Sequence, residues 1–210
     1  MAKIRSGVLG NTRGKVSGIV GSQWKDVNYI REYVKPANPQ TAAQIVQRDL
    51  MKNCVAFCKP IIGPIFNAYT DRFQKSMSGY NYFIKQNIAE FVAVPTYSNI
   101  VISEGKLSPI SSLEVFYDSV TGGVVVTWVA NNGNNGADTD KVFWVIYDKS
   151  TGLWYIDAEE TARSTEMDSD TLPTGLTFGN LNCWALVAQY KNTIVDMISN
   201  SVHCVAQESE

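Results

Sequence analysis

The stretch KVFWVIYDKSTGLWYI (Lys141–Ile156) contains two segments typical of β-strands with a turn between them. Lys141–Tyr147 and Leu153–Ile156 are rich in β-branched and aromatic residues, which pack well on a pleated surface. Between them, Lys149-Ser150-Thr151-Gly152 supplies residues that favour turns. The stretch therefore predicts sheet structure in the second half of the chain.

Five further segments after Pro95 have the same character, and turn signals separate them. They are Leu113–Tyr117, Val124–Val129, Leu176–Phe178, Leu181–Tyr190 and Met197–Ala206. Seven short strands at roughly ten-residue spacing are typical of an antiparallel sandwich of the immunoglobulin or fibronectin type, with Trp128 and Trp144 in its core. Asn131–Gly136 predicts an exposed hairpin loop, and because functional contacts concentrate on loops it is also a candidate for recognition.

The segment before the strands has the spacing of helices. Asn38-Pro39 and the pair Thr41 and Gln44 are typical of a helix start, the latter as a capping box. We expect one buried stripe before Pro60, formed by Ala43, Val46, Leu50, Cys54, Phe57 and Cys58. A second helical stretch, interrupted near Gly63-Pro64, should bury Ile65, Phe66, Tyr69 and Phe73. A third should start at Ser78 and bury Tyr80, Phe83, Ile84, Asn87, Ile88 and Phe91.

The first 36 residues predict an extended arm. Five glycines up to Gly21 disfavour a helix, since each costs about 0.5–1 kcal/mol relative to alanine. Alternation around Val27–Val34, with turn-favouring residues at Gly21-Ser22 and Lys25-Asp26, predicts a β-hairpin. An isolated hairpin is marginal in water. We therefore expect Gln23–Val34 to pair with the C-terminal sheet of the same chain or with a neighbouring subunit.

The predicted fold class is thus α+β. It comprises a glycine-rich arm with a β-hairpin (1–36), a small helical element (37–94) and an Ig/fibronectin-like sandwich (95–210).

Charge is segregated along the chain. Residues up to Val92 carry thirteen lysines and arginines against five acidic residues, whereas the remainder carries five against fifteen. Three interpretations remain open: the halves pack on each other within one chain, the basic part of one copy docks on the acidic part of the next, or the basic half binds nucleic acid. No recognised nucleic-acid-binding motif accompanies the basic residues.

The sequence offers little for catalysis, so we expect no enzyme activity, cofactor or metal. The single histidine, His203, lies in a predicted strand without a nucleophile partner. The four cysteines read as buried small residues, and no phosphate-binding glycine loop is present. A series of acidic residues fits no calcium loop and is interpreted as a solvated face: Asp157, Glu159, Glu160, Glu166, Asp168 and Asp170. We also find no signal peptide or membrane-spanning apolar run.

Residues 3–48 carry a motif series that resembles a known family. The series includes Gly14-Lys15-Val16, Val20-Gly21, Trp24-Lys25, Tyr29, Arg31, Asn38-Pro39, Thr41, Gln44 and Arg48. It is similar to uncharacterised proteins of about this length from gut Bacteroidetes and their crAss-like tailed phages, and the similarity covers most of the chain more loosely. Ser17 stands where the family commonly has glycine. The resemblance implies a phage or Bacteroidetes context rather than an activity.

In that context we expect a structural virion protein that is assembled in the host cytoplasm and forms an oligomeric ring in the tail or neck. Its partners would be further copies and other phage structural proteins, with no membrane and no specific nucleic-acid contact. Trp24, Tyr29, Arg31 and Tyr33 are the candidate interface residues, because these residue types are enriched at binding hot spots. The alternatives are a non-catalytic bacterial module that recognises glycan or protein through Asn131–Gly136 and Asp168–Gly175, and a nucleic-acid-associated virion protein.

Overall fold

A computed structural model describes most of the chain, which forms two compact units, Met1–Gln44 and Ile45–Glu210. The described residues are 2–4, 13–24, 27–35, 37–38, 40–71, 77–92, 94–133, 135–157 and 160–209. The expected turn residues Lys25 and Asp26, and the expected helix residues Pro39 and Phe73, lie outside them.

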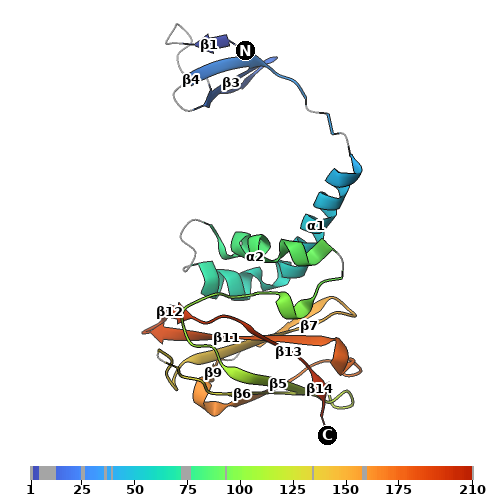
Figure 1. Cartoon of the computed structure of the whole chain (residues 1–210), viewed down its shortest axis with the longest axis vertical. Helices are drawn as coiled ribbons and strands as arrows, with labels where there is room; N and C mark the ends of the chain where they lie inside the picture. Colours follow the sequence, from blue (N-terminus) through green and yellow to red (C-terminus); the bar gives the residue numbers. More distant parts are fainter. Residues whose placement is uncertain are drawn as a thin grey trace. The chain divides into compact units, whose positions relative to one another are not determined.

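The second unit contains the predicted β-sandwich, which confirms the α+β class with an Ig/fibronectin-like domain (Figure 1). One sheet has the order β10 (Met167–Thr171), β6 (Gly123–Val129), β5 (Ser111–Tyr117) and β14 (Gln207–Glu208). The other has the order β12 (Ile194–Ile198), β11 (Leu181–Lys191), β7 (Lys141–Asp148) and β8 (Leu153–Ile156), with β13 (Val202–Val205) also beside β11 and β9 (Thr161–Ala162) also beside β7. All these pairs are antiparallel except β14 with β5.

Two of the strand predictions need correction. Leu176–Phe178 is not a strand, because a 3₁₀ turn η7 (Phe178–Asn180) occupies its end and the edge strand is β10 instead. Strand β10 was not predicted because its sequence is acidic and polar. The expected strand Met197–Ala206 is broken into β12 and β13, with Ser199–Ser201 between them.

The core between the two sheets contains both predicted tryptophans. Trp128 is 3% exposed and Trp144 is 1% exposed. Strand alternation places Val142, Trp144 and Ile146 of β7 in this core, together with every second residue of β11. The prediction that Trp128 and Trp144 lie in the core of the sandwich is therefore confirmed.

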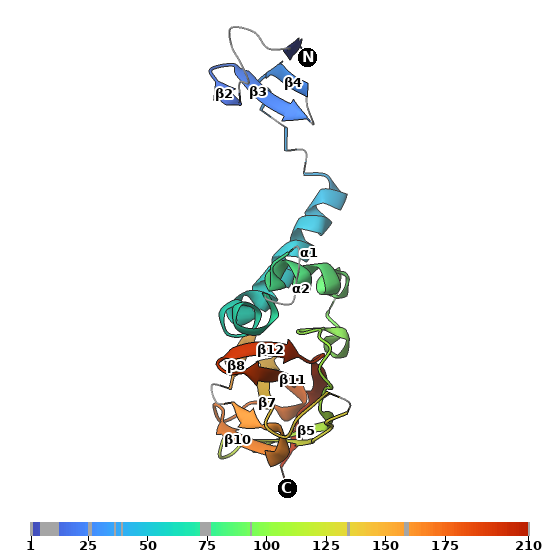
Figure 2. The same cartoon turned by 90° about the vertical axis from the view of Figure 1, so that its left-hand side faces the viewer.

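The opposite face of β7 and β11 is buried as well, under a layer of helices (Figure 1 and Figure 2). Phe143 and Val145 of β7 and Trp184 and Leu186 of β11 belong to a second core that they share with the helices. Because β11 has no solvent face, Leu181–Ala188 is buried without a break. The second unit thus has three layers: helices, the β11 sheet and the β6 sheet.

The helical layer starts with α1 (Ala42–Cys58), whose capping box is confirmed. The Thr41 N–H donates to Gln44 Oε1 at 3.3 Å, and the Gln44 N–H donates to Thr41 Oγ1 at 3.4 Å. The layer continues through η1 (Lys59–Ile61), the π-helix η2 (Ile62–Thr70), α2 (Gly79–Asn87), η4 (Ile88–Val92) and η5 (Tyr97–Asn99). Gly63-Pro64 does not interrupt it, since the wider η2 turns include both residues.

The buried stripe of α1 is shorter than predicted. Residues 41–49 are exposed, and Leu50 is the first buried residue of the helix. Ala43 and Val46 therefore lie on the predicted stripe but outside the core. The stripe from Leu50 to Cys58 is buried as expected, and so is Asn87 of α2, whose side chain hydrogen-bonds the backbone of Phe83 and Val101.

Strand β10 forms an edge of the sandwich, and two of its outward N–H groups are occupied by its own side chains. The Trp128 N–H donates to Glu166 O, and the Leu172 N–H donates to Gly122 O, so the even-numbered residues of β10 form the hydrogen-bonded pairs with β6. The N–H groups of the odd-numbered residues Ser169 and Thr171 therefore point away from β6. The Ser169 N–H donates to Asp168 Oδ1 at 2.8 Å, and the Thr171 N–H donates to Asp170 Oδ1 at 2.6 Å. These two carboxylates satisfy donors that an incoming strand would need.

Candidate functional site

The N-terminal unit is a separate four-stranded antiparallel sheet. Its strands are β1 (Ala2–Ile4), β2 (Gly14–Val16), β3 (Ile19–Trp24) and β4 (Val27–Glu32), in the order β1-β4-β3-β2. The predicted hairpin is present, and within the described part of this unit its strands pair with each other and with β1 and β2. We call this element the N-terminal sheet.

One turn of the sheet lies earlier than predicted. Gly21 and Ser22 lie within β3, and the reversal between β2 and β3 occurs at Ser17-Gly18. Ser17 has a φ of 52°, in the left-handed region that favours glycine. A glycine at this position would adopt the same conformation without strain.

The register brings all four predicted interface residues to one face of the sheet. Val20 is paired with Arg31, Ser22 with Tyr29, and Trp24 with Val27. The Tyr33 N–H donates to Gly18 O at 2.8 Å and continues the alternation. Directly opposed residues share a face, so this face contains Trp24, Tyr29, Arg31 and Tyr33.

Lys15 joins these residues, although sequence reasoning missed it. Lys15 is paired with Val20, and its Nζ lies 3.5 Å from the centroid of the Tyr33 ring. The face on which Lys15 lies can be assigned only when the turn is placed at Ser17-Gly18. A shift of the register by one residue would place Lys15 on the opposite face of the sheet. We define the basic aromatic face as Lys15, Trp24, Tyr29, Arg31 and Tyr33.

The N-terminal sheet has no core of its own among the residues described with side chains. From Arg13 to Gln44, each of these is half-buried or exposed. Trp24 is 67% exposed and Tyr33 is 43% exposed. A sheet normally buries one face against another layer, whereas the N-terminal sheet has no buried residue among those described with side chains.

Its charge is opposite to that of the rest of the chain. Residues 1–44 contain seven lysines and arginines against two acidic residues, a net charge of +5, whereas residues 45–210 contain eleven against eighteen, a net charge of −7. A basic face with exposed aromatic rings can bind through cation–π contacts, charge-assisted hydrogen bonds and apolar burial. It contains no nucleophile paired with a base.

His203, the single histidine, has a structural position on β13. Its Nε2 lies 3.1 Å from Asn182 Oδ1, and its ring packs on Trp184 with 5.0 Å between centroids. Burial lowers the pKa of His203 below the ordinary 6.5. The contacts with Asn182 and Trp184, together with the lowered pKa, give the imidazole ring a structural position in the sheet.

We expect this histidine to make stability depend on pH. Because its folded-state pKa is lowered, the unfolded chain binds the proton first, and stability is lost as pH falls from about 6.5 through the lowered pKa. The variant His203→Gln should lose less stability between about pH 7.5 and about pH 5 than the wild type does. Thermal unfolding of both proteins at both pH values measures this difference, and identical pH profiles would count against it.

The cysteines of α1 are buried and have raised thiol pKa values. Burial raises the pKa of the Cys54 thiol to about 11 and, with the neighbouring Cys54, that of Cys58 to about 12, so neither is an activated thiol. Among the described residues, no group of three or more His, Cys, Asp or Glu side chains could hold a metal ion.

Several acidic residues bond to the protein itself. Asp168 Oδ2 accepts from Trp144 Nε1 at 2.8 Å, Glu160 Oε1 accepts from the Tyr190 hydroxyl at 2.7 Å, and Glu166 Oε1 accepts from the Ala130 N–H at 3.0 Å. The expected solvated face is thus partly a set of structural acceptors. Glu159 of this series lies outside the described residues.

The loop Asn131–Gly136 is not a hairpin loop, because it connects β6 of one sheet to β7 of the other. Arg163, with 0% of its side chain exposed, anchors it: Nη1 donates to Asn131 O at 3.0 Å, and Nη2 donates to Ser108 O. Asn135 Oδ1 accepts hydrogen bonds from the N–H and the hydroxyl of Ser108, and Asn135 Nδ2 donates to Lys106 O. Asp168–Thr171, the start of the other proposed recognition loop, belongs to β10.

No helix in the described part of the chain is long and apolar enough to cross a membrane.

The solved structures that match this chain include two fibronectin type III domains of low similarity. The fn3 domain of human collagen alpha-1(XX) chain is 16% identical, with 51% of this chain and 89% of that chain covered and a TM-score of 0.32. An Fn3-like protein from Clostridium thermocellum is 21% identical, with 50% and 97% covered and a TM-score of 0.30. A comparison with curated proteins finds no match.

One family model matches residues 11–197, which include β2 to β4, the helical layer and the sandwich up to β12. The chain therefore belongs to the family of unknown function DUF6266.

Proposed function

We propose that this protein is a non-catalytic structural virion protein of a tailed phage whose copies assemble into a ring in the tail or neck. The observation that carries the proposal is the N-terminal sheet, which displays an aromatic, positively charged face and has no buried residue among those described with side chains. Such a sheet gains stability by covering that face with another surface.

A second copy of the chain is the partner that the charge distribution favours. The N-terminal unit carries +5 and the remainder −7, so the basic unit of one copy complements the acidic unit of the next. A contact between two different surfaces of identical subunits is heterologous, and it closes into a ring when the rotation permits. The resemblance to proteins of crAss-like phages supports the virion context, with assembly in the host cytoplasm beside other phage structural proteins.

We expect the full-length protein to form a closed oligomer that depends on the basic aromatic face. Trp24→Ala with Arg31→Ala should weaken self-association roughly 30-fold or more, the size expected when hot-spot residues are truncated. The control Val16→Ala with Glu32→Ala changes the opposite face of the same sheet, since Val16 pairs with Ile19 and Ile19 with Glu32. Native mass spectrometry and sedimentation give the copy number and the affinity.

Three results would contradict the proposal. They are a strictly monomeric full-length protein, absence of the protein from purified particles, and equal loss of association in the two double variants.

A further inference from the structure

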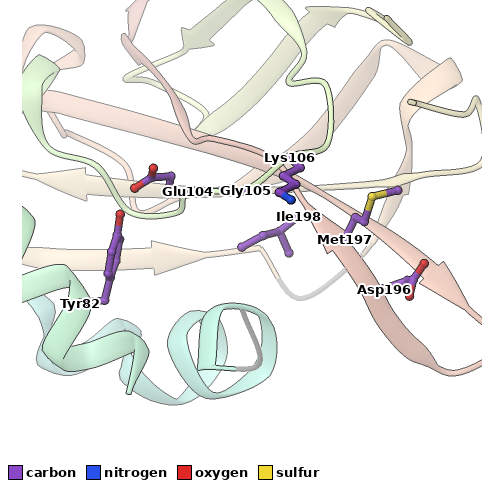
Figure 3. Close-up of a pocket in the computed structure, with 7 residues that line it drawn as sticks. All are labelled: Tyr82, Glu104, Gly105, Lys106, Asp196, Met197 and Ile198. Atoms are coloured by element: carbon purple, nitrogen blue, oxygen red, sulfur yellow. The ribbon is translucent and has the colours of Figure 1, made fainter. Parts of the chain in front are cut away.

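A groove follows the outer edge of β12 in the second unit (Figure 3). It has a volume of about 560 Å³, within the range of pockets that bury ligands. Its lining includes Met197 and Ile198 of β12, Tyr82 of α2 and the segment Glu104–Lys106. We call it the edge groove.

One wall of the edge groove is fixed by backbone contacts. The Leu107 N–H donates to Ile198 O at 2.9 Å, and the Gly105 N–H donates to Asn200 Oδ1 at 3.0 Å. Gly105 lies so close to β12 that an added Cβ would overlap the Ile198 carbonyl. A wall held in this way loses little conformational freedom when a partner binds.

Gln86 of α2 holds two of the lining side chains together. Its Nε2 donates to the Tyr82 hydroxyl at 2.6 Å and to Glu104 Oε2 at 3.3 Å. Figure 3 shows Tyr82 extending from α2 toward Glu104. The phenol and the carboxylate are thus held together on one side of the groove.

Asp196 supplies a second carboxylate at the other end of the groove. The register between β11 and β12 passes from Met197 to Val195, so Asp196 is the extra residue of a β-bulge. Bulges at sheet edges often re-aim a side chain. The lining therefore includes the half-buried Met197 of β12, two exposed carboxylates, Glu104 and Asp196, and a single ammonium group, Lys106.

We infer that the edge groove receives the basic aromatic face of a second copy, with Lys15 and Arg31, which flank Val20 across the N-terminal sheet, at the two carboxylates. The inference rests on the proposed function and names the surface that the N-terminal sheet binds. Charge identifies the occupant, because the groove lies on the acidic unit and the N-terminal sheet is the basic one. The exposed indole of Trp24 and the half-buried side chain of Met197 also match in chemistry.

Charge reversal in the groove tests the inference in the full-length protein. Glu104→Lys with Asp196→Lys should weaken self-association by roughly tenfold or more, because like charges then face each other. The matched control, Glu114→Lys with Glu208→Lys, makes the same change in net charge at exposed positions of the other sheet. Adding Lys15→Glu with Arg31→Glu to the groove variant should restore association.

A cross-link identifies the contact directly. A photoreactive phenylalanine at position 33, in a mixture of isotopically labelled and unlabelled chains, should cross-link between copies to peptides that contain residues 104–106 or 196–198. If the oligomer forms but the cross-links map elsewhere or stay within one copy, the groove is not the site and the proposed function stands. If no oligomer forms in the wild type, the proposed function itself is wrong.

Discussion

Replacing Arg163 with methionine is expected to lower the free energy of unfolding by about 3–5 kcal/mol, the cost of breaking a buried ion pair by removing one partner. Arg163 Nη1 lies 3.7 Å from Asp140 Oδ2, and the two side chains are 0% and 1% exposed. The variant leaves the Asp140 carboxylate buried without its cation. It also removes the donors of Asn131 O and Ser108 O.

A second substitution separates these two causes. Arg163→Met with Asp140→Asn removes the uncompensated charge, while the amide oxygen still accepts from the Ala137 N–H as Asp140 Oδ2 does at 2.8 Å. We expect the double variant to recover about half of the loss. Urea denaturation measures both, and Lys191→Met, at an exposed position, serves as a control that should change stability by less than about 0.5 kcal/mol. Equal loss in the single and double variants would assign the whole effect to the orphaned carbonyls.

Replacing Phe57 with alanine is expected to cost about 3–5 kcal/mol, as for other buried phenylalanines. Phe57 of α1 is 6% exposed and contacts six aromatic rings, those of Phe83, Phe91, Tyr97, Tyr147, Trp154 and Trp184. Its backbone carbonyl also accepts from Trp154 Nε1 at 2.8 Å. The substitution would leave a cavity between the helical layer and the β11 sheet.

Because Trp184 and Tyr147 belong to the sheet, the loss should appear as a lower midpoint of one cooperative transition. Phe57→Leu keeps most of the volume and should cost less, and Val94→Ala, where valine is 85% exposed, should change stability by less than about 0.5 kcal/mol. In a denaturant titration, far-UV circular dichroism follows the unfolding of the helices, and tryptophan fluorescence follows the unfolding of the sheets. Separate transitions for the two probes would show that helices and sandwich do not unfold as one.

Elements with a strong local pattern were predictable from the sequence. Thr41 and Gln44 marked the helix start because the capping box is a local interaction, and β8 has the predicted bounds because a turn and a tight apolar run define it. Trp128 and Trp144 are buried as expected, since large aromatic residues in alternating strands face the core. Strand β10 was missed because its residues are acidic and polar and lack the β-branched and aromatic character on which the strand predictions rested.

The candidate site was only partly predictable. The four anchor residue types could be selected from the sequence, but their common face depends on the register that the Ser17-Gly18 turn sets. The edge groove left no sequence signal, because its parts come from α2, the segment around Gly105 and β12. Likewise, the burial of Arg163 depends on a loop between two sheets, which local periodicity does not report.

The aspartates of β10 also affect whether crowded molecules can pair through their edge strands. Asp168 and Asp170 occupy the N–H groups that a strand from another molecule would need in order to extend the sheet. At high local concentration, the β10 edges of two molecules are therefore hindered from pairing with each other and starting a cross-β stack. Protection of this kind uses two side chains already present on the strand and requires no covering loop.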